Sequence, residues 1–432
     1  MAHRACRDLF LNAILPKYTL AWVIVAAFGS ASTLAAADTA VLRVAGLGDP
    51  GELQCPQPKA RQQASRPIAE ATGLAQAVFT PLAWMPTPPA NAQPNALKIG
   101  LWGDSHTASG TFADSMLEAL RLPLAQTHPS FMAPTWGLKG VRHPLRRVCL
   151  SDDWQLSLAY RTSKEGPDNH AKSLSALQTA QAGAFLWLDF RYPSPQTRVK
   201  WADIHLTKDS TDKGLTLGIT VDGGTESVVQ VPAGGPARLR VQADLPWATL
   251  QLRVLAGGAR IDGIAPVYEA PSRVILDVFS IPGATAKGWR TVNPEYLRRE
   301  DPLGKGYDVV ILQSGTNESL DPDFKVAVYE QQISASLSRL KAAYPRARCV
   351  LMGPPDAQKS STHVRLINDS QYRLAIAQGC AHWHWQKAMG GPGSAQRWWA
   401  KGWMQADLLH LTPEGYTQSA RSLVSMVPIK PR

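Results

Sequence analysis

An alternation of short buried strands with amphipathic helices constrains the fold of this 432-residue chain more than any other feature of its sequence. Residues 97–102 have the pattern of a buried strand, and apolar residues at helical spacing follow them. The alternation returns late in the chain, with strands expected at 274–280, 308–313, 349–352 and 380–385, a helix at 324–343 and a closing helix from Pro413. Strands that alternate with helices predict a doubly wound, flavodoxin-like α/β/α domain.

A different pattern separates these two parts of the chain. Short alternating runs occur at 185–190, 199–206, 215–221, 227–231, 237–241 and 249–254, and turns such as Asp222-Gly223-Gly224 lie between them. This spacing is typical of an antiparallel β-sandwich. We therefore expect an α/β domain in two parts, 96–149 and 266–432, with a β-sandwich inserted at 150–265, because insertions into a loop cost little closure entropy.

The N-terminus has the pattern of a secretory signal peptide. Three basic residues, Arg4, Arg7 and Lys17, precede the apolar run 19–28, and small residues end at Ala37. An uncleaved membrane anchor is the alternative, since the apolar and small residues together approach the length of a span. Cleavage after residue 37 would leave a chain with no stable membrane span. We therefore expect a periplasmic or secreted protein.

Residues 38–95 are expected to form an N-terminal arm and a linker rich in Pro, Ala and Gln, with one short strand at 41–45. The segment Gly46–Gly51 fits the dinucleotide-binding pattern G-x-G-x-x-G and follows that strand. However, Pro50 and the residues after it cannot open the helix that would hold a pyrophosphate. No cofactor is therefore expected.

The four cysteines that remain after signal cleavage are Cys55, Cys149, Cys349 and Cys380. An exported protein permits disulfides, and four cysteines allow three pairings. We favour Cys349 with Cys380, because both would open neighbouring strands of one sheet, and Cys55 with Cys149 by default. Four free buried thiols are the alternative.

The composition excludes several classes of protein. Hydrophobic residues make up 44% of the chain and charged residues 18%, which is too apolar for an intrinsically disordered protein. With 5 Cys, 33 Gly and 33 Pro, the chain is neither a small disulfide scaffold nor collagen-like. The formal charge of +11 favours an anionic partner without naming one, and no nucleic-acid partner is expected.

Three separated segments carry residues that a hydrolase needs. In Gly103-Asp104-Ser105-His106, Ser105 lies where a buried strand turns into a helix, so its backbone N–H can face an oxyanion. Asn317 follows the strand 308–313 and can donate its side-chain amide there. Asp407 precedes His410 by three residues and can accept its Nδ1–H, which leaves Nε2 to take a proton from Ser105. Taken singly, each feature has an ordinary alternative: an N-cap serine, a turn asparagine and a chance D-x-x-H pair.

Together and in this order, the three segments resemble the nucleophile, asparagine and Asp/His blocks of the SGNH/GDSL hydrolase superfamily. The resemblance covers residues 96–122 and about 270–432, and it implies a doubly wound α/β/α fold. Carried over by position, Ser105 is the nucleophile, Asp407 and His410 complete the triad, and Asn317 is an oxyanion donor. Gly283 is the best match to the remaining glycine block, with Gly288 close by.

The insertion, the signal peptide and the tract 385–393 (WQKAMGGPG) resemble the periplasmic peptidoglycan O-acetylesterases, in which the inserted β-sandwich is similar to a carbohydrate-binding module. The resemblance implies a serine esterase that removes O-acetyl groups from a polysaccharide through an acetyl-enzyme on Ser105. Within that class of substrates, it favours O-acetylated peptidoglycan. A polysaccharide O-acetyltransferase with the same triad and a non-catalytic glycan-binding assembly factor are the alternatives. The expected partner is therefore a polymeric glycan.

Aromatic residues near the Asp/His block suit a sugar ligand. Five tryptophans precede Asp407 within a short stretch: Trp383, Trp385, Trp398, Trp399 and Trp403. Indole faces can stack on pyranose rings, although at least two of the five are expected to fill the core. His382 and His384 alternate onto one face of a strand, but no further ligand type nearby completes a metal site, so no metal is expected.

Overall fold

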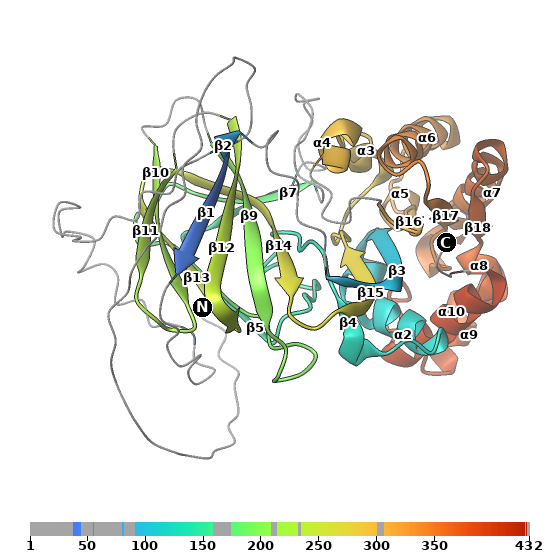
Figure 1. The fold of residues 1–432 in the computed structure, drawn as a ribbon. Coiled ribbons are helices and arrows are strands. Elements are labelled where there is room, and N and C mark those ends of the chain that lie inside the picture. Colours follow the sequence, from blue (N-terminus) through green and yellow to red (C-terminus); the bar gives the residue numbers. More distant parts are fainter. Residues whose placement is uncertain are drawn as a thin grey trace.

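The computed structural model describes residues 38–44, 55, 80–81, 91–158, 174–208, 214–231, 235–299, 306–427 and 429. The predicted signal peptide at 1–37, the Gly46–Gly51 segment and most of the predicted linker lie outside the described residues. Figure 1 shows two halves, one of strands alone and one in which helices surround a second set of strands. Within the described ranges, none of the helices combines the length and apolarity that crossing a membrane requires.

A six-stranded parallel sheet forms the centre of the mixed half. Its strands are β3 (Ala92–Trp102), β4 (Thr127–His128), β15 (Ser272–Val278), β16 (Val309–Gln313), β17 (Arg348–Met352) and β18 (Ala381–Trp383). They are ordered β18-β17-β16-β3-β15-β4, and each neighbouring pair is parallel. The chain leaves β3 for β15 on one side and later reaches β16 on the other. Ligands of open α/β sheets bind at such a point, outside the carboxyl ends of the strands.

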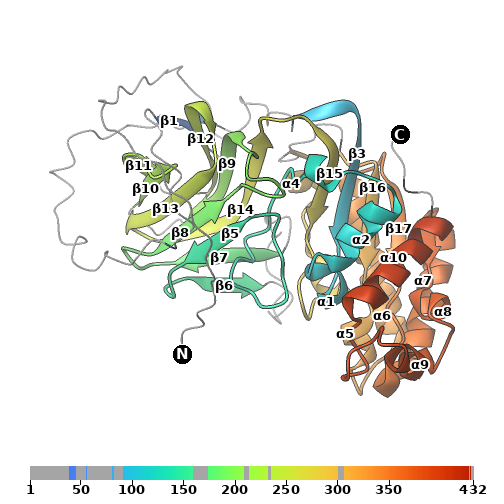
Figure 2. The ribbon, with the colours of Figure 1, turned by 90° about the horizontal axis from the view of Figure 1, so that it is seen from below.

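Helices cover both faces of this sheet (Figures 1 and 2). On one face, α2 (Thr111–Ala119) and α10 (Pro413–Met426) share a core with Val309 and Ile311 of β16. On the other, α6 (Val326–Ala343) and α7 (Ser361–Gln378) share a core with Val310 and Leu312. Alternate residues of one strand therefore serve opposite layers, which requires the continuous apolar run that β16 has. The predicted doubly wound fold is confirmed.

Short helices follow the sheet's carboxyl edge and complete the mixed half. They are α1 (Ser105–Ala108), α3 (Ala286–Trp289), α4 (Pro294–Arg299), α5 (Thr316–Ser319), α8 (Trp385–Ala388) and α9 (Ser394–Ala400), with 3-10 turns at Leu124–Gln126 and Gln358–Ser360. The first, α1, follows β3, and α3 and α5 follow β15 and β16. Three loops that are distant in the sequence therefore meet at one edge of the sheet.

Two further sheets form the other half. The first has the order β2-β1-β12-β9-β14-β7-β6 and the second β11-β10-β13-β8-β5. Their bounds are β1 (Asp38–Val44), β2 (Thr80–Pro81), β5 (Arg147–Leu150), β6 (Gln155–Leu158), β7 (Ser175–Thr179), β8 (Phe185–Asp189), β9 (Val199–Lys208), β10 (Leu215–Val221), β11 (Ser227–Val231), β12 (Gly235–Trp247), β13 (Thr249–Ala256) and β14 (Ala259–Tyr268). Buried residues of both sheets, such as Ile204 and Leu250, belong to one core.

The N-terminal arm differs from the expectation. Strand β1 lies inside the seven-stranded sheet, between β2 and β12, and runs parallel to β12. It is the single parallel pair among the described strands of these two sheets. Strand β5 also enters the five-stranded sheet before residue 150. The predicted domain limits stay a prediction.

Both favoured disulfides are present. Cys349 in β17 is bonded to Cys380, which directly precedes β18, so the bridge joins two neighbouring parallel strands. Cys55 is bonded to Cys149 of β5 and so ties the N-terminal segment to the five-stranded sheet. The predicted pairing is therefore confirmed.

Candidate active site

Ser105, His410 and Asp407 lie in one hydrogen-bonded row. Ser105 Oγ is 3.0 Å from His410 Nε2, although the two residues are 305 positions apart in the sequence. His410 Nδ1 is 2.7 Å from Asp407 Oδ2. The other carboxylate oxygen, Oδ1, accepts the backbone N–H groups of Leu409 and His410, each at 3.0 Å. This geometry lets the imidazole take a proton from the serine while the carboxylate holds its orientation.

Hydrogen bonds among its neighbours hold Ser105 at the start of α1. Asp104 is the N-cap of that helix, and its Oδ1 accepts the His106 N–H at 2.9 Å. Gln313 at the end of β16 exchanges two hydrogen bonds of 2.8 Å with the side chain and backbone of Asp104. A Cβ on Gly103 would lie 2.3 Å from Thr107 Oγ1, so this close approach requires glycine. The N-cap is thus Asp104, and the alternative of Ser105 as an ordinary N-cap is wrong.

The charges around His410 favour its role as a base. Burial of Asp407 is outweighed by the hydrogen bonds from His410 and Leu409, which lower the pKa of the Asp407 carboxyl below its ordinary value. An ionised carboxylate therefore faces Nδ1. His106 lies behind the row, with its ring centroid 5.4 Å from that of His410 and its Nδ1 3.1 Å from the Tyr416 hydroxyl. Burial lowers the pKa of His106 to about 4, so this ring is neutral and places no positive charge beside His410.

Gly283 and Asn317 lie on two loops that touch each other. Gly283 is exposed and has φ +83°, a conformation that favours glycine, in a turn closed by the Ala284 N–H to Ile281 O bond of 2.9 Å. Asn317 Nδ2 donates to Ala284 O at 2.9 Å, and the amide has a second hydrogen. Gly288, the other glycine considered, is buried in α3, and its N–H already donates to Thr285 O at 3.0 Å.

Several polar residues of this site were not predicted from the sequence. Gln313 and Glu318 flank the Ser314–Asn317 segment, and Asp104 and His106 flank Ser105. All four make contacts with segments that are remote in the sequence. One feature of the sequence could have indicated them: each is an ionisable or amide side chain close to the end of a buried strand.

The tryptophan cluster divides between the core and the surface. Trp383, Trp385 and Trp398 are buried in the core shared with α2 and α10. Trp399 is 48% exposed, and Trp403 is half-buried with Lys401 Nζ 4.8 Å from its ring centroid. Two of the five are therefore accessible to a ligand. Across the described ranges, His, Cys, Asp and Glu form no group of three suited to a metal.

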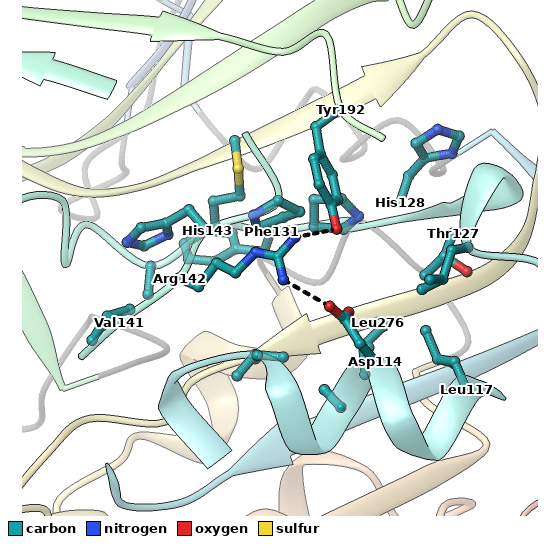
Figure 3. Close-up of a pocket in the computed structure, with 18 residues that line it drawn as sticks. Asp114, Leu117, Thr127, His128, Phe131, Val141, Arg142, His143, Tyr192 and Leu276 are labelled. Atoms are coloured by element: carbon teal, nitrogen blue, oxygen red, sulfur yellow. Dashed lines mark hydrogen bonds and ion pairs between the residues drawn. The ribbon is translucent and has the colours of Figure 1, made fainter. Parts of the chain in front are cut away.

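A pocket lies beside α2, next to the half made of strands (Figure 3). Its wall is largely apolar, with Leu117 and Leu276 among the lining residues. The Arg142 guanidinium donates to Asp114 Oδ2 and to the Tyr192 hydroxyl, each at 2.8 Å, and so bridges the two halves of the molecule. The lining includes neither the Ser105 row nor the loops of Gly283 and Asn317.

Residues 256–418 match the model of the GDSL-like Lipase/Acylhydrolase family. The chain carries a domain of this family. Its predicted SGNH-type fold and its predicted class, an esterase, are thereby confirmed. The family model covers the loops of Gly283 and Asn317 and the Asp407–His410 segment, whereas Ser105 lies before it because the strands of the other half intervene.

Several solved structures are similar to this chain. A peptidoglycan O-acetylesterase aligns with a TM-score of 0.60 and 22% identity, over 77% of this chain and 90% of that one. A lipase/acylhydrolase from Enterococcus faecalis aligns over 37% and 79% of the two chains, with 20% identity and a TM-score of 0.28. A family 2 carbohydrate esterase with a carbohydrate-binding domain from Corynascus thermopiles covers 65% and 98%, with 12% identity and a TM-score of 0.27. A search of curated protein sequences found no match.

Proposed function

We propose that this esterase removes O-acetyl groups from a polysaccharide, with O-acetylated peptidoglycan as substrate, through an acetyl-enzyme on Ser105. The observation that carries the proposal is the row from Ser105 Oγ through His410 to Asp407, with separations of 3.0 and 2.7 Å. A serine in this geometry attacks a carbonyl carbon as its proton moves to Nε2 of the histidine.

The first half of the reaction forms the acetyl-enzyme. Ser105 Oγ bonds to the acetyl carbonyl carbon, and His410 Nε2 takes the hydroxyl proton. The bond between that carbon and the sugar oxygen then breaks, and His410 returns the proton to the departing sugar oxygen. In the second half, water gives a proton to His410 and attacks the same carbon. The bond between that carbon and Ser105 Oγ then breaks, His410 returns the proton to Oγ, and acetate leaves.

The negative charge on the carbonyl oxygen is stabilised by three N–H groups. These are the backbone N–H of Ser105 at the start of α1, the backbone N–H of Gly283 and the side-chain amide of Asn317. The proximity of the last two rests on the bond between Asn317 and the Gly283 loop. Donors fixed before the reaction are effective because they need no reorganisation as the charge develops.

Three features support a polymeric glycan as the substrate. The fold is similar to that of a protein named as a peptidoglycan O-acetylesterase. Trp399 exposes its indole and Trp403 is partly accessible just before the Asp407–His410 segment. The signal peptide predicted at 1–37 would export the chain to the periplasm or beyond, where such glycans lie. We further propose that the half made of strands acts as an inserted domain for glycan capture.

Acetate release tests the proposal. The protein is incubated with O-acetylated peptidoglycan and with the same material after alkaline de-O-acetylation, and free acetate is measured. We expect release from the first substrate alone and none with Ser105→Ala. Acetate release from small acetyl esters but not from O-acetylated peptidoglycan would contradict the proposed substrate.

A further inference from the structure

Glu318 lies behind the two loops that carry Gly283 and Asn317. Its Oε1 accepts the backbone N–H of Ala286 at 2.7 Å and the Ser314 hydroxyl at 3.0 Å. Its Oε2 is buried and makes no hydrogen bond to the described residues. The reaction described above does not use this carboxyl, and a buried acceptor without a partner has a cost that a protein rarely keeps without a role.

The Gly283 loop is held at each end by groups from other segments. At its start, the Ile281 N–H donates at 2.9 Å to the carbonyl oxygen of Gly103, two residues before the nucleophile. At its end, Glu318 accepts the Ala286 N–H and Ser336 Oγ donates to Ala286 O at 2.7 Å. Between them, Asn317 binds Ala284 O. The Gly283 N–H therefore lies on a short turn whose end is fixed by Glu318.

Asn317 and Glu318 are consecutive residues, and they bind the same loop at Ala284 and Ala286. A movement of Ala286 would change the direction of the turn that contains Gly283. It would also change the carbonyl that orients the Asn317 amide. Two of the three proposed oxyanion donors therefore depend on the position of Ala286, which Glu318 holds together with Ser336.

We propose that Glu318 is a positioning residue that fixes the Gly283 loop and the Asn317 amide for oxyanion stabilisation. This inference rests on the proposed roles of Gly283 and Asn317. Glu318 touches neither the substrate nor the reacting atoms in this scheme. Its effect is on the placement of the donors, and a misplaced donor stabilises the developing charge less well.

The surroundings of Glu318 also give it an ionisation in the working range of pH. Burial raises the pKa of Glu318 to about 7, against its hydrogen bonds to Ala286 and Ser314, and the charge of Asp104, the N-cap of α1, raises it further. Burial and the charge of Glu318 raise the pKa of Tyr329 in α6, and His363 of α7 lies 3.0 Å from the carbonyl oxygen of Ser319. The carboxylate is a stronger acceptor for the Ala286 N–H than the protonated acid.

Two variants separate this role from a general structural one. Glu318→Ala removes the acceptor, and we expect kcat on a small activated acetyl ester to fall by about 10- to 100-fold while KM changes by less than about threefold. Glu318→Gln keeps an acceptor oxygen for Ala286, so its kcat at about pH 8 should stay within about fivefold of wild type. Glu330→Gln is the matched control, because that carboxylate is on the exposed side of α6 and pairs with Arg373.

The pH profile is the second readout. Protonation of Glu318 weakens the same acceptor that Glu318→Gln replaces, so the wild-type kcat/KM should show a step of up to about fivefold around pH 7. Glu318→Gln should lack this step, and Glu330→Gln should keep it. Circular dichroism checks that each variant folds.

A kcat of Glu318→Ala within twofold of wild type would overturn the inference, as would a Glu318→Gln profile identical to that of the wild type. If Glu318→Ala fails to fold, the Glu318→Gln profile decides alone. The small ester makes the test independent of the glycan substrate. Failure to release acetate from peptidoglycan would therefore count against the proposed substrate and not against the role of Glu318.

Discussion

Glu318→Gln should change the pH dependence of stability in a direction that the structure fixes. The carboxyl has a pKa of 4.5 when unperturbed and about 7 in the folded protein, because burial disfavours its charged form. A raised pKa of an acid means that its contribution to stability is fully present below about pH 4.5 and is lost as pH rises through about 7. Glutamine does not titrate, so the stability of the variant does not fall with pH for this reason.

The size of the effect follows from the two pKa values. Each pH unit between them corresponds to about 1.4 kcal/mol, so the wild type should lose about 3 kcal/mol relative to Glu318→Gln between about pH 4 and about pH 8.5. Ionisations elsewhere are shared by both proteins and cancel in the difference. In the variant, an amide nitrogen replaces the unpartnered Oε2, and burying it without a partner lowers the free energy of unfolding. This decrease is the same at both pH values, so it does not affect the pH dependence.

Urea unfolding followed by tryptophan fluorescence at about pH 4, 6 and 8.5 measures this difference in the free energy of unfolding. Glu330→Gln serves as the control, since the hydrogen bond from Arg373 lowers the pKa of Glu330 and predicts a difference of the opposite sign. A wild type and a Glu318→Gln variant whose difference stays constant within about 1 kcal/mol over this range would refute the reasoning.

Three further predictions concern the site and its frame. Ser105→Ala should lower kcat/KM on a small acetyl ester by at least about a thousandfold with the circular dichroism spectrum unchanged, and activity within tenfold of wild type would remove the serine from the mechanism. Gly283→Ala places a side chain at φ +83°, so the free energy of unfolding should fall by about 1–2 kcal/mol and kcat by about tenfold. An unchanged kcat would exclude the Gly283 N–H as a donor. Cys380→Ser opens a loop of 31 residues and should lower the free energy of unfolding by about 3 kcal/mol, measured without reductant; a change below about 1 kcal/mol would show that Cys349 and Cys380 add little.

The fold was predictable where burial gives a strand a continuous apolar run. The stretches 308–313 and 349–352 appear as β16 and β17 for that reason, since both faces of a parallel sheet are covered. Helix α7 was missed because its buried side includes the polar residues Asn368 and Gln371. Asn368 Nδ2 donates to Pro354 O and Val364 O, so part of this buried side is held by hydrogen bonds in addition to apolar contacts. Hydrophobic periodicity contains no signal of that kind.

The same contrast applies to the site. Asp407 and His410 are three residues apart, so their contact can be read from local spacing. Glu318 meets Ala286, 32 positions earlier, through a backbone N–H that every residue except proline carries. A contact to a backbone N–H therefore cannot be predicted from residue types. The parallel pairing of β1 with β12 was hidden for the same reason.

The central position of β3 determines when the catalytic machinery can assemble. Ile99 and its neighbours pair with β15 on one side and β16 on the other, and both partners lie beyond residue 270. At synthesis rates of about 5–20 residues per second, the strand that leads to Ser105 waits on the order of ten seconds or more for its neighbours. Strands β5 to β14 emerge during this interval and can pair among themselves. A chain of such high contact order folds slowly, and the proposed Ser105–His410 contact cannot form until His410, 305 positions after Ser105, has emerged. Nascent chains that end before His410 therefore contain the proposed nucleophile, and we expect them to have no activity.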